Sequence, residues 1–301
     1  MQWRDQGTLI EIVPPKEFSF RECLVFLGRS NQEVLHRIQN QQLFKLVKIM
    51  NELILLKIGW KNHRMTIEFP MGEPTWLIKE EVVHYICNWF DLERDLSGFY
   101  EMASKDTVLQ SLITKYDGLR IIGIPDLFEA LTWAIMGQQI NLSFAYTLKK
   151  RFVEHFGEKI DIEGDTFWLY PTFEAIALLE VDALRKLQFT TRKAEYVIGT
   201  ARAIATGKLS KQLLIELDAE LQQEVLVNIK GIGPWTAHYV MMKCLLTQSA
   251  FPMTDVGLHL ALKAQLGLDV KPDLDEIKKM ASNWSGWEAY ATFYLWRSLY
   301  E

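Results

Sequence analysis

Two short segments of this 301-residue chain contain residue types that could act together on a ligand. In the first, KGIGPW at 230–235, the two glycines permit a tight turn and Pro234 suits the first position of a helix. Bare amide groups at a helix N-terminus form an anion site, and the helix dipole strengthens it. The segment therefore predicts a turn that can hold a phosphate without a positively charged side chain.

Aromatic and acidic side chains accompany this turn. Trp235 and Tyr239 are four residues apart, so they share one face of the helix that follows the turn. In the second segment, FPMTD at 251–255, Asp255 follows Pro252 and begins another helix. An Asp at such a position is usually a helix cap. Electron-rich aromatic faces also suit a cationic ligand, so these side chains are candidates for a binding pocket.

Helices must position both segments. The pattern over 219–228 predicts a helix that ends at the turn, and 234–247 predicts the helix that follows it. A further helix is expected over 255–266. Other helical patterns cover 126–137, 141–157, 182–188, 191–206, 210–216 and 286–299.

The boundary between the first two of these upstream helices is well marked. Asp126 with Glu129 forms a capping-box arrangement, and Asn141 is a good cap for the next helix. Between them, 137–140 (GQQI) predicts a short break.

Residues 1–95 have mixed α+β character. Short helices are expected in FRECLVFLGR (20–29) and EVLHRIQ (33–39), and strands in LFKLVKIM (43–50), ELILLKIGW (52–60) and RMTIEFP (64–70). Short turns at Asn51-Glu52 and Lys61-Asn62 would join the strands. This part is expected to form an antiparallel meander backed by the preceding helices.

Composition excludes several classes of protein. A net charge of −5 argues against a surface coated with positive charge for gripping nucleic acid. The three cysteines lie far apart and the six histidines form no metal-binding motif. The N-terminus lacks the apolar core of a signal peptide, and no apolar run approaches membrane-spanning length. We therefore expect a soluble cytoplasmic protein without membrane contact.

The motifs resemble those of a known family. The segment at 229–237 is similar to the hairpin of DNA glycosylases of the helix-hairpin-helix/Gly-Pro-Asp superfamily. The second half of that signature resembles 251–263, where Asp255 lies twenty-four residues past the first hairpin glycine. The likeness extends to 118–142 and to GWEAYATFYLW at 286–296. Within the superfamily the chain looks like the bacterial AlkA type, DNA-3-methyladenine glycosylase II.

This resemblance implies a fold and its division along the chain. The fold class would be α+β: an N-terminal antiparallel-sheet (TBP-like) domain followed by an all-helical helix-hairpin-helix glycosylase domain pair. The sheet domain would span 1–95 and the helical region 96–301, with the helix-hairpin-helix at 221–246. The two helical subdomains would be about 119–248, and 96–118 plus 249–301.

The resemblance also implies the chemistry. Superfamily members that cut the DNA strand carry a Lys where this chain has Trp235, and an indole cannot form the Schiff base with the sugar. A monofunctional glycosylase without lyase activity is therefore expected. Asp255 matches the family's aspartate, which would stabilise an oxocarbenium-like sugar and orient or deprotonate the attacking water. Alkylated purines such as 3-methyladenine and 7-methylguanine are cationic, so they can leave without a dedicated acid.

Further site residues follow from the same likeness. Trp235, Tyr239 and Trp287 would line a pocket for a base rotated out of the duplex. Gln139 matches the position of a wedge that fills the gap, although many relatives have an apolar residue there. The amides of Gly231, Gly233 and Thr236 would bind a DNA phosphate. The carbonyls of Val227, Ile229 and Gly231 align with positions that hold a monovalent cation, Na⁺ or K⁺, as a binding aid; no other cofactor is required.

The sequence leaves alternatives open. Pocket shape is not legible from sequence, so deaminated or oxidised bases are also candidate substrates. A non-catalytic helix-hairpin-helix DNA-binding protein would keep the hairpin without needing Asp255, and a helical protein that binds an aromatic small molecule would leave the hairpin unexplained. The basic residues at 149–151 and 192–193 could touch phosphates, but most such runs are solvated faces. The expected partner is double-stranded DNA with alkylated bases, bound by a monomer.

Overall fold

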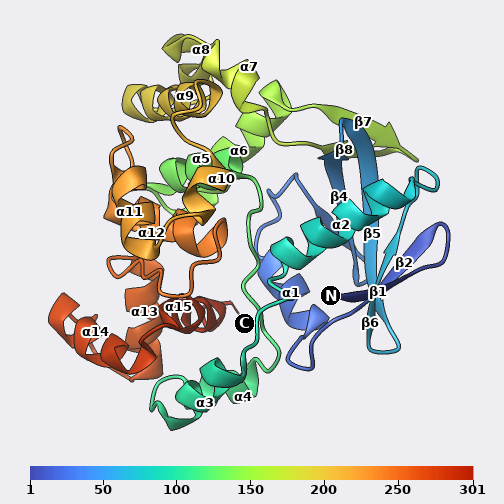
Figure 1. Ribbon diagram of the computed structural model, residues 1–301. Coiled ribbons are helices and arrows are strands. Elements are labelled where there is room, and N and C mark those ends of the chain that lie inside the picture. Colours follow the sequence, from blue (N-terminus) through green and yellow to red (C-terminus); the bar gives the residue numbers. More distant parts are fainter. Residues whose placement is uncertain (301) are drawn as a thin grey trace.

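The computed structural model describes residues 1–300, which form a sheet-bearing half and a mainly helical half (Figure 1). The N-terminal half contains six antiparallel strands in the order β1-β2-β6-β5-β4-β3. Their bounds are β1 Gln2–Asp5, β2 Leu9–Val13, β3 Arg37–Gln39, β4 Gln42–Ile49, β5 Glu52–Lys61 and β6 Arg64–Glu68. Two helices, α1 Phe20–Leu27 and α2 Trp76–Trp89, accompany this sheet. The predicted α+β class is confirmed.

The sheet is larger than the predicted three-stranded meander. β4, β5 and β6 match the predicted strands, while β1 and β2 were not foreseen. The helix expected at 33–39 was a wrong prediction, because Arg37–Gln39 instead pairs with the start of β4. Asn40 and Gln41 join the two strands with φ of 52° and 61°, a backbone conformation that Asn tolerates well and that suits a two-residue hairpin.

One hairpin interrupts the helical half, which was expected to be all helix. β7 Lys159–Ile162 and β8 Asp165–Trp168 form a two-stranded sheet. Phe167 from β8 is buried against Leu46 and Leu55, which are paired neighbours on β4 and β5. This contact covers part of the second face of the N-terminal sheet, over β4 and β5. It also explains why β5 is apolar on both faces, since Leu56 and Ile58 belong to the main core instead.

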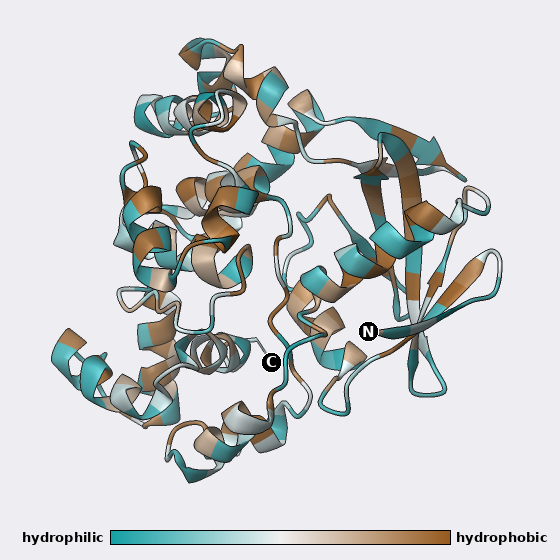
Figure 2. Cartoon of the chain, viewed as in Figure 1, coloured by the Kyte–Doolittle hydropathy of each residue, from teal (hydrophilic) through white to brown (hydrophobic). Residues whose placement is uncertain are grey.

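The helical half carries the expected helices with small shifts at their ends, and further helices at 97–105, 110–115, 173–177 and 274–281 that were not foreseen. Their bounds are α3 Ser97–Lys105, α4 Gln110–Lys115, α5 Leu127–Gly137, α6 Leu142–Phe156, α7 Phe173–Ala177, α8 Val181–Arg185, α9 Thr191–Ala205, α10 Lys211–Ile215, α11 Ala219–Val227, α12 Pro234–Lys243, α13 Val256–Gln265, α14 Leu274–Ala281, the short 3-10 helix η1 Ser282–Trp284 and α15 Glu288–Arg297. Asp126 caps α5 and Asn141 caps α6 as predicted, but the Glu129 carboxylate pairs with Lys149 instead of completing a capping box. Most of these helices mix hydrophobic and hydrophilic residues (Figure 2). None in residues 1–300 is long and apolar enough to cross a membrane.

A buried extended segment, residues 118–125, runs between the two halves and is bonded to both. The amide of Ser19 donates to the carbonyl of Gly118 at 2.7 Å, and the amide of Ile124 donates to the carbonyl of Lys243 at 2.6 Å. Gly118 has φ +75°, and an added Cβ there would lie 2.7 Å from the Ser19 nitrogen. The fully buried Arg120 donates to three carbonyls of the N-terminal region. This segment thus fixes how the sheet half faces α12.

Candidate active site

The carboxylate of Asp255, the N-cap residue of α13, receives three N–H donors. Its Oδ1 accepts the Leu258 amide at 2.8 Å, which is the bond that caps the helix. The indole Nε1 of Trp296 donates to the same oxygen at 2.8 Å, and Nε1 of Trp235 donates to Oδ2 at 3.0 Å. An ordinary cap needs only the first bond. The two indoles therefore hold a partly exposed carboxylate in one fixed orientation.

Three aromatic rings form a row beside this carboxylate. The centroids of Trp235 and Tyr239 are 5.6 Å apart on α12, and those of Tyr239 and Trp296 are 5.9 Å apart between α12 and α15. The structure thus brings together Trp235, Tyr239 and Asp255, as expected. The hydroxyl of Tyr239 accepts the indole N–H of Trp133 at 2.8 Å. Burial raises the pKa of Tyr239 well above its ordinary value, so this wall of the site is uncharged.

The remaining pocket residue expected from the sequence, Trp287, lies elsewhere. Its ring packs at 5.9 Å from Phe99 and 6.1 Å from Tyr290, against the α3 side of α15. An added Cβ on Gly98 would lie 3.2 Å from this indole, which shows how closely α3 approaches it. The assignment of Trp287 to the Asp255 cluster is therefore corrected to Trp296. The sequence contains both tryptophans, and nine positions along a helix place them on opposite faces.

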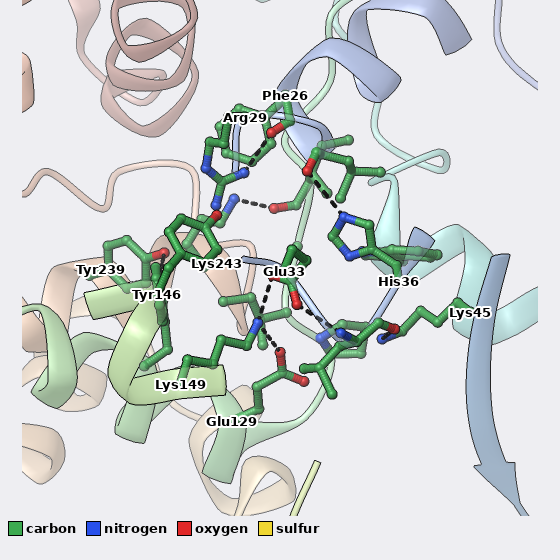
Figure 3. Close-up of a pocket in the computed structure, with 18 of the residues that line it drawn as sticks. Phe26, Arg29, Glu33, His36, Lys45, Glu129, Tyr146, Lys149, Tyr239 and Lys243 are labelled. Carbon is green, nitrogen blue, oxygen red and sulfur yellow. Dashed lines mark hydrogen bonds and ion pairs between the residues drawn. The ribbon is translucent and has the colours of Figure 1, made fainter. Parts of the chain in front are cut away.

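A cavity of about 50 Å³ lies where the N-terminal half meets the helical half (Figure 3). Tyr239 belongs to its wall together with Trp133, Tyr146 and Arg29. This volume admits a few water molecules. Ionisable groups line its far end: Glu33, His36, Lys45, Glu129 and Lys149.

The hairpin between α11 and α12 has the expected open amide turn. Gly231 has φ +94°, and a Cβ added there would lie 2.2 Å from the ring of Tyr196 on α9. Gly233 is exposed, and a Cβ there would meet nothing within 4 Å. Gly233 is also the N-cap of α12, and no side chain caps this helix. By contrast, α5, α6, α9, α11 and α13 all begin with a side-chain cap.

The break between α5 and α6 is tied to this hairpin by Gln138. Its Nε2 donates to the carbonyl of Gly231 at 2.9 Å and to Oγ1 of Thr236 at 3.0 Å. The Thr236 side chain is buried, so only its backbone amide belongs to the open turn. The next residue, Gln139, is exposed with φ +56°. The hydrogen bonds of Gln138 therefore hold Gln139 at a tip beside the hairpin.

Two of the basic residues that were candidates for phosphate contacts are buried instead. Lys149 pairs with Glu33 at 3.0 Å and Glu129 at 3.5 Å. Lys193 donates to the carbonyl of Met136 at 2.6 Å, and burial lowers its pKa to about 8. These two lysines support the fold around the site rather than contact a ligand.

The carbonyls expected to hold a monovalent cation fit that role only in part. Neutral oxygens suit such an ion, but the Gly231 carbonyl already accepts Gln138 and the Ile229 carbonyl accepts the Ile232 amide at 3.0 Å. The Val227 carbonyl, at the end of α11, remains a candidate donor. Among residues 1–300, no three His, Cys, Asp or Glu side chains gather as a metal-binding group.

Comparison with known proteins decides the family. Residues 132–286 match the family described as "HhH-GPD superfamily base excision DNA repair protein". This chain belongs to the HhH-GPD superfamily. Its residues 11–131 match a second family, "8-oxoguanine DNA glycosylase, N-terminal domain". The sheet half and the helical half therefore both have counterparts among DNA glycosylases.

Individual relatives cover the whole chain. It is 43% identical over 306 residues to a DNA-3-methyladenine glycosylase of Bacillus subtilis, covering 100% of both chains. The fold is similar to that of a 3-methyladenine DNA glycosylase from Archaeoglobus fulgidus, with TM-score 0.82, 23% identity and 95% and 96% coverage. A Clostridium acetobutylicum 8-oxoguanine glycosylase/lyase, solved with double-stranded DNA, gives TM-score 0.78, 20% identity and 99% and 97% coverage. The chain is a DNA glycosylase of the HhH-GPD superfamily.

Two residues of this HhH-GPD site could not be identified from the sequence patterns. Trp296 was missed because Trp287 lies in the same segment and was chosen instead. The nine-residue helical spacing between them already indicated that both could not face one pocket. Gln138 stands in a break that the sequence did reveal, but nothing in the chain indicates which of the two glutamines turns inward.

Proposed function

We propose that this glycosylase is monofunctional and hydrolyses the N-glycosidic bond of alkylated purines, 3-methyladenine and 7-methylguanine, in duplex DNA during base excision repair. The observation that carries the proposal is the Asp255 carboxylate held by two indoles beside a row of aromatic rings. The full-length identity to a DNA-3-methyladenine glycosylase supports the substrate class.

In the proposed reaction, Asp255 acts on the sugar. As the bond from the anomeric carbon to N9 breaks, its electron pair goes to the base and positive charge grows on the sugar. A fixed anion beside that carbon stabilises this charge without having to reorganise. The bonds from Trp235 and Trp296 supply the fixed orientation. Water then adds to the anomeric carbon, and its proton passes to the carboxylate or to solvent.

The base requires little help to leave. An alkylated purine is a cation, and the electron pair it receives makes it neutral. The aromatic faces of Trp235, Tyr239 and Trp296 would attract the cationic base once it has rotated out of the duplex. An acid to protonate the leaving group is unnecessary, which agrees with the uncharged wall that Tyr239 provides.

DNA would be held at the hairpin. The uncapped N-terminus of α12 leaves amides of its first turn open to a phosphate, and Gly233 keeps the surface there clear of side-chain atoms. Gln139 would enter the gap left by the rotated base. A monovalent cation held by carbonyls near the end of α11, among them Val227, would assist as a bridge to phosphate without taking part in the chemistry.

An oxidised-base specificity is the second candidate, because residues 11–131 match the 8-oxoguanine glycosylase N-terminal domain. Strand cleavage by Schiff-base chemistry needs an amine next to the sugar, and the position adjoining Asp255 holds the indole of Trp235. We therefore expect base release from methylated DNA to exceed release from DNA that contains 8-oxoguanine. Greater release of 8-oxoguanine would replace the proposed substrate class.

The decisive experiment treats duplex DNA with dimethyl sulfate, adds the enzyme and measures free 3-methyladenine and 7-methylguanine by chromatography. Asp255→Asn keeps a good cap but loses the charge, so base release should fall at least ~100-fold while DNA binding persists. Asp273→Asn is the matched control, because Asp273 caps α14 in the same way and contacts no aromatic ring of the site. This control should release bases at the wild-type rate.

Other outcomes would contradict the proposal. Equal release by wild type and Asp255→Asn would remove the assigned role of the carboxylate. DNA binding by the wild type with no release from any damaged duplex would favour a binding module. Borohydride added during the reaction should trap no covalent adduct, and an adduct would overturn the monofunctional assignment.

A further inference from the structure

The N-terminal half contributes an arginine to the seam next to the aromatic row. Arg29 follows α1 and lines the 50 Å³ cavity together with Tyr239 and Tyr146. It also lines an open groove of about 480 Å³ that includes Leu299 and Tyr300 near the C-terminus. The side chain of Arg29 therefore borders both the cavity and the open groove, as Figure 3 shows for the cavity side.

Two rows of rings connect Arg29 to the catalytic carboxylate. On one side, Trp235 adjoins Asp255 and packs on Tyr239, which lines the same cavity as Arg29. On the other, Trp296 packs edge-on to Phe293, which packs at 4.6 Å on Phe26, and Arg29 lies 3.9 Å from the centre of the Phe26 ring. Arg29 and Asp255 thus lie at opposite ends of a chain of packed aromatic rings.

The charges of Arg29 and Asp255 act on the same two tyrosines. Burial raises the pKa of Tyr239, while the Arg29 charge acts to lower it and the Asp255 charge acts to raise it. The same two charges act in the same directions on the hydroxyl of Tyr300, whose pKa burial also raises. Both tyrosines therefore lie within the fields of Arg29 and Asp255.

Most of the hydrogen-bonding capacity of Arg29 is available to a ligand. One Nη donates to the carbonyl of Phe26 at 2.7 Å, and a guanidinium has five N–H donors. Within residues 1–300 no carboxylate lies within ion-pair distance of it. The other cation nearby, Lys243, is committed to the carbonyl of Ile122, and burial lowers its pKa well below the ordinary value. Arg29 is thus the charged donor at this end of the site.

When the sugar's anomeric carbon lies at Asp255, the edge of the purine that is farthest from N9 points away from the carboxylate. That edge bears the substituent on carbon 6, an oxygen in guanine-type bases and an amino group in adenine-type bases. We propose that Arg29 is a specificity-determining residue that donates a hydrogen bond to the 6-oxo group and so favours alkylated guanines over alkylated adenines. This inference rests on the proposed function of the site.

The physical reason is the difference between an acceptor and a donor. Arginine donates to O6 of guanine, whereas an amino group at the same place presents hydrogens to the cation. A site built to hydrogen-bond one group rejects an analogue that lacks it. Purines methylated at N3 or N7 are all cations, so repulsion by the Arg29 charge affects both base types alike. The ratio of the release rates of guanine-type and adenine-type bases therefore reports the effect of the hydrogen bond.

The experiment compares matched pairs of bases in one tube. Duplex DNA treated with dimethyl sulfate contains 7-methylguanine and 7-methyladenine, and also 3-methylguanine and 3-methyladenine. Release rates are measured by chromatography for wild type, Arg29→Ala, Arg29→Lys and Arg21→Ala. Arg21 is the control because it is an exposed arginine on α1, the helix that precedes Arg29.

Arg29→Ala should lower the guanine-to-adenine ratio about tenfold in both pairs, since a hydrogen bond from a charged donor is lost. Arg29→Lys should give an intermediate ratio and Arg21→Ala the wild-type ratio. A general loss of folding cancels in the ratio. An unchanged ratio, or one that follows the position of the methyl group instead of the 6-substituent, would overturn the role of Arg29. Failure of the wild type to release any methylated base would instead contradict the proposed function.

Discussion

At the scale of single residues, the site depends on which side chains reach one carboxylate. Asp255 would be an ordinary helix cap if Leu258 were its only donor, and the indoles of Trp235 and Trp296 make it different. The i, i+4 spacing of Trp235 and Tyr239 predicted their shared face correctly, because that spacing is a local property of a helix. The choice between Trp287 and Trp296 depended on how α15 rotates against α13, which no local rule specifies.

A pair of matched variants tests this choice. Trp296→Phe keeps a ring in place but removes the N–H that donates to Asp255, so base release should fall about tenfold in kcat/KM. Trp287→Phe should stay within about twofold of wild type, because this ring packs on Phe99 and Tyr290. The measurement is initial release of methylated bases over a range of DNA concentrations. A larger loss for Trp287→Phe would restore the assignment made from sequence.

At the scale of elements, the hairpin shows two glycines with different tasks. Gly231 needs to be glycine for two reasons, a positive φ and the ring of Tyr196 against it. Gly233 has φ −91°, which any residue adopts, and open space around its Cα. Because glycine has no side chain, Gly233 leaves the N-terminus of α12 free of side-chain atoms. Gln138 then links the α5–α6 break to this turn by hydrogen bonds, which hold the two segments side by side.

Alanine substitutions should separate these tasks. Gly231→Ala should cost at least about 2 kcal/mol, because a left-handed alanine is strained and Tyr196 must move, and the Tm should drop by several degrees. Gly233→Ala should change stability by less than about 0.5 kcal/mol. Thermal unfolding followed by circular dichroism measures both. Equal Tm values for the two variants would show that the hairpin does not press on α9 as described.

At the scale of the whole molecule, the two halves share a buried seam with charged groups. Lys149 of α6 pairs with Glu33 of the N-terminal half. Burial alone would raise the pKa of Glu33, but Lys149 beside it holds that pKa well below its usual range. His36 lies in the same seam, and its Nε2 donates a hydrogen bond to the carbonyl of Leu27 at 3.1 Å. Burial lowers the pKa of His36 from 6.5 to about 4, although Glu33 opposes this effect.

The seam therefore predicts a dependence of stability on pH. Between pH 6.5 and about 4 the unfolded chain binds a proton at His36 that the folded chain excludes, so the free energy of unfolding should fall as pH decreases through this window. Because the ring is only partly buried, we expect this residue to account for about 2 kcal/mol. Urea unfolding of His36→Gln should show a shallower fall than wild type. His84→Gln, which changes an exposed histidine on α2, should follow wild type.

The sequence by itself determined what depends on neighbours along the chain. It specified the hairpin, the start of α12, the capped Asp255 and the strands β4 to β6, because turn chemistry, helix periodicity and capping are short-range effects. It also carried the motifs that the family comparison confirmed.

Only the tertiary structure decided which distant side chains meet. It brought Trp296 to Asp255, buried Lys149 and Lys193, paired 37–39 as a strand and placed the β7–β8 hairpin on the sheet. Each of these outcomes is set by packing between elements far apart in sequence, where burial outweighs local propensity. The position of Arg29 beside the aromatic row has the same origin, since the seam between the halves exists only once both have folded.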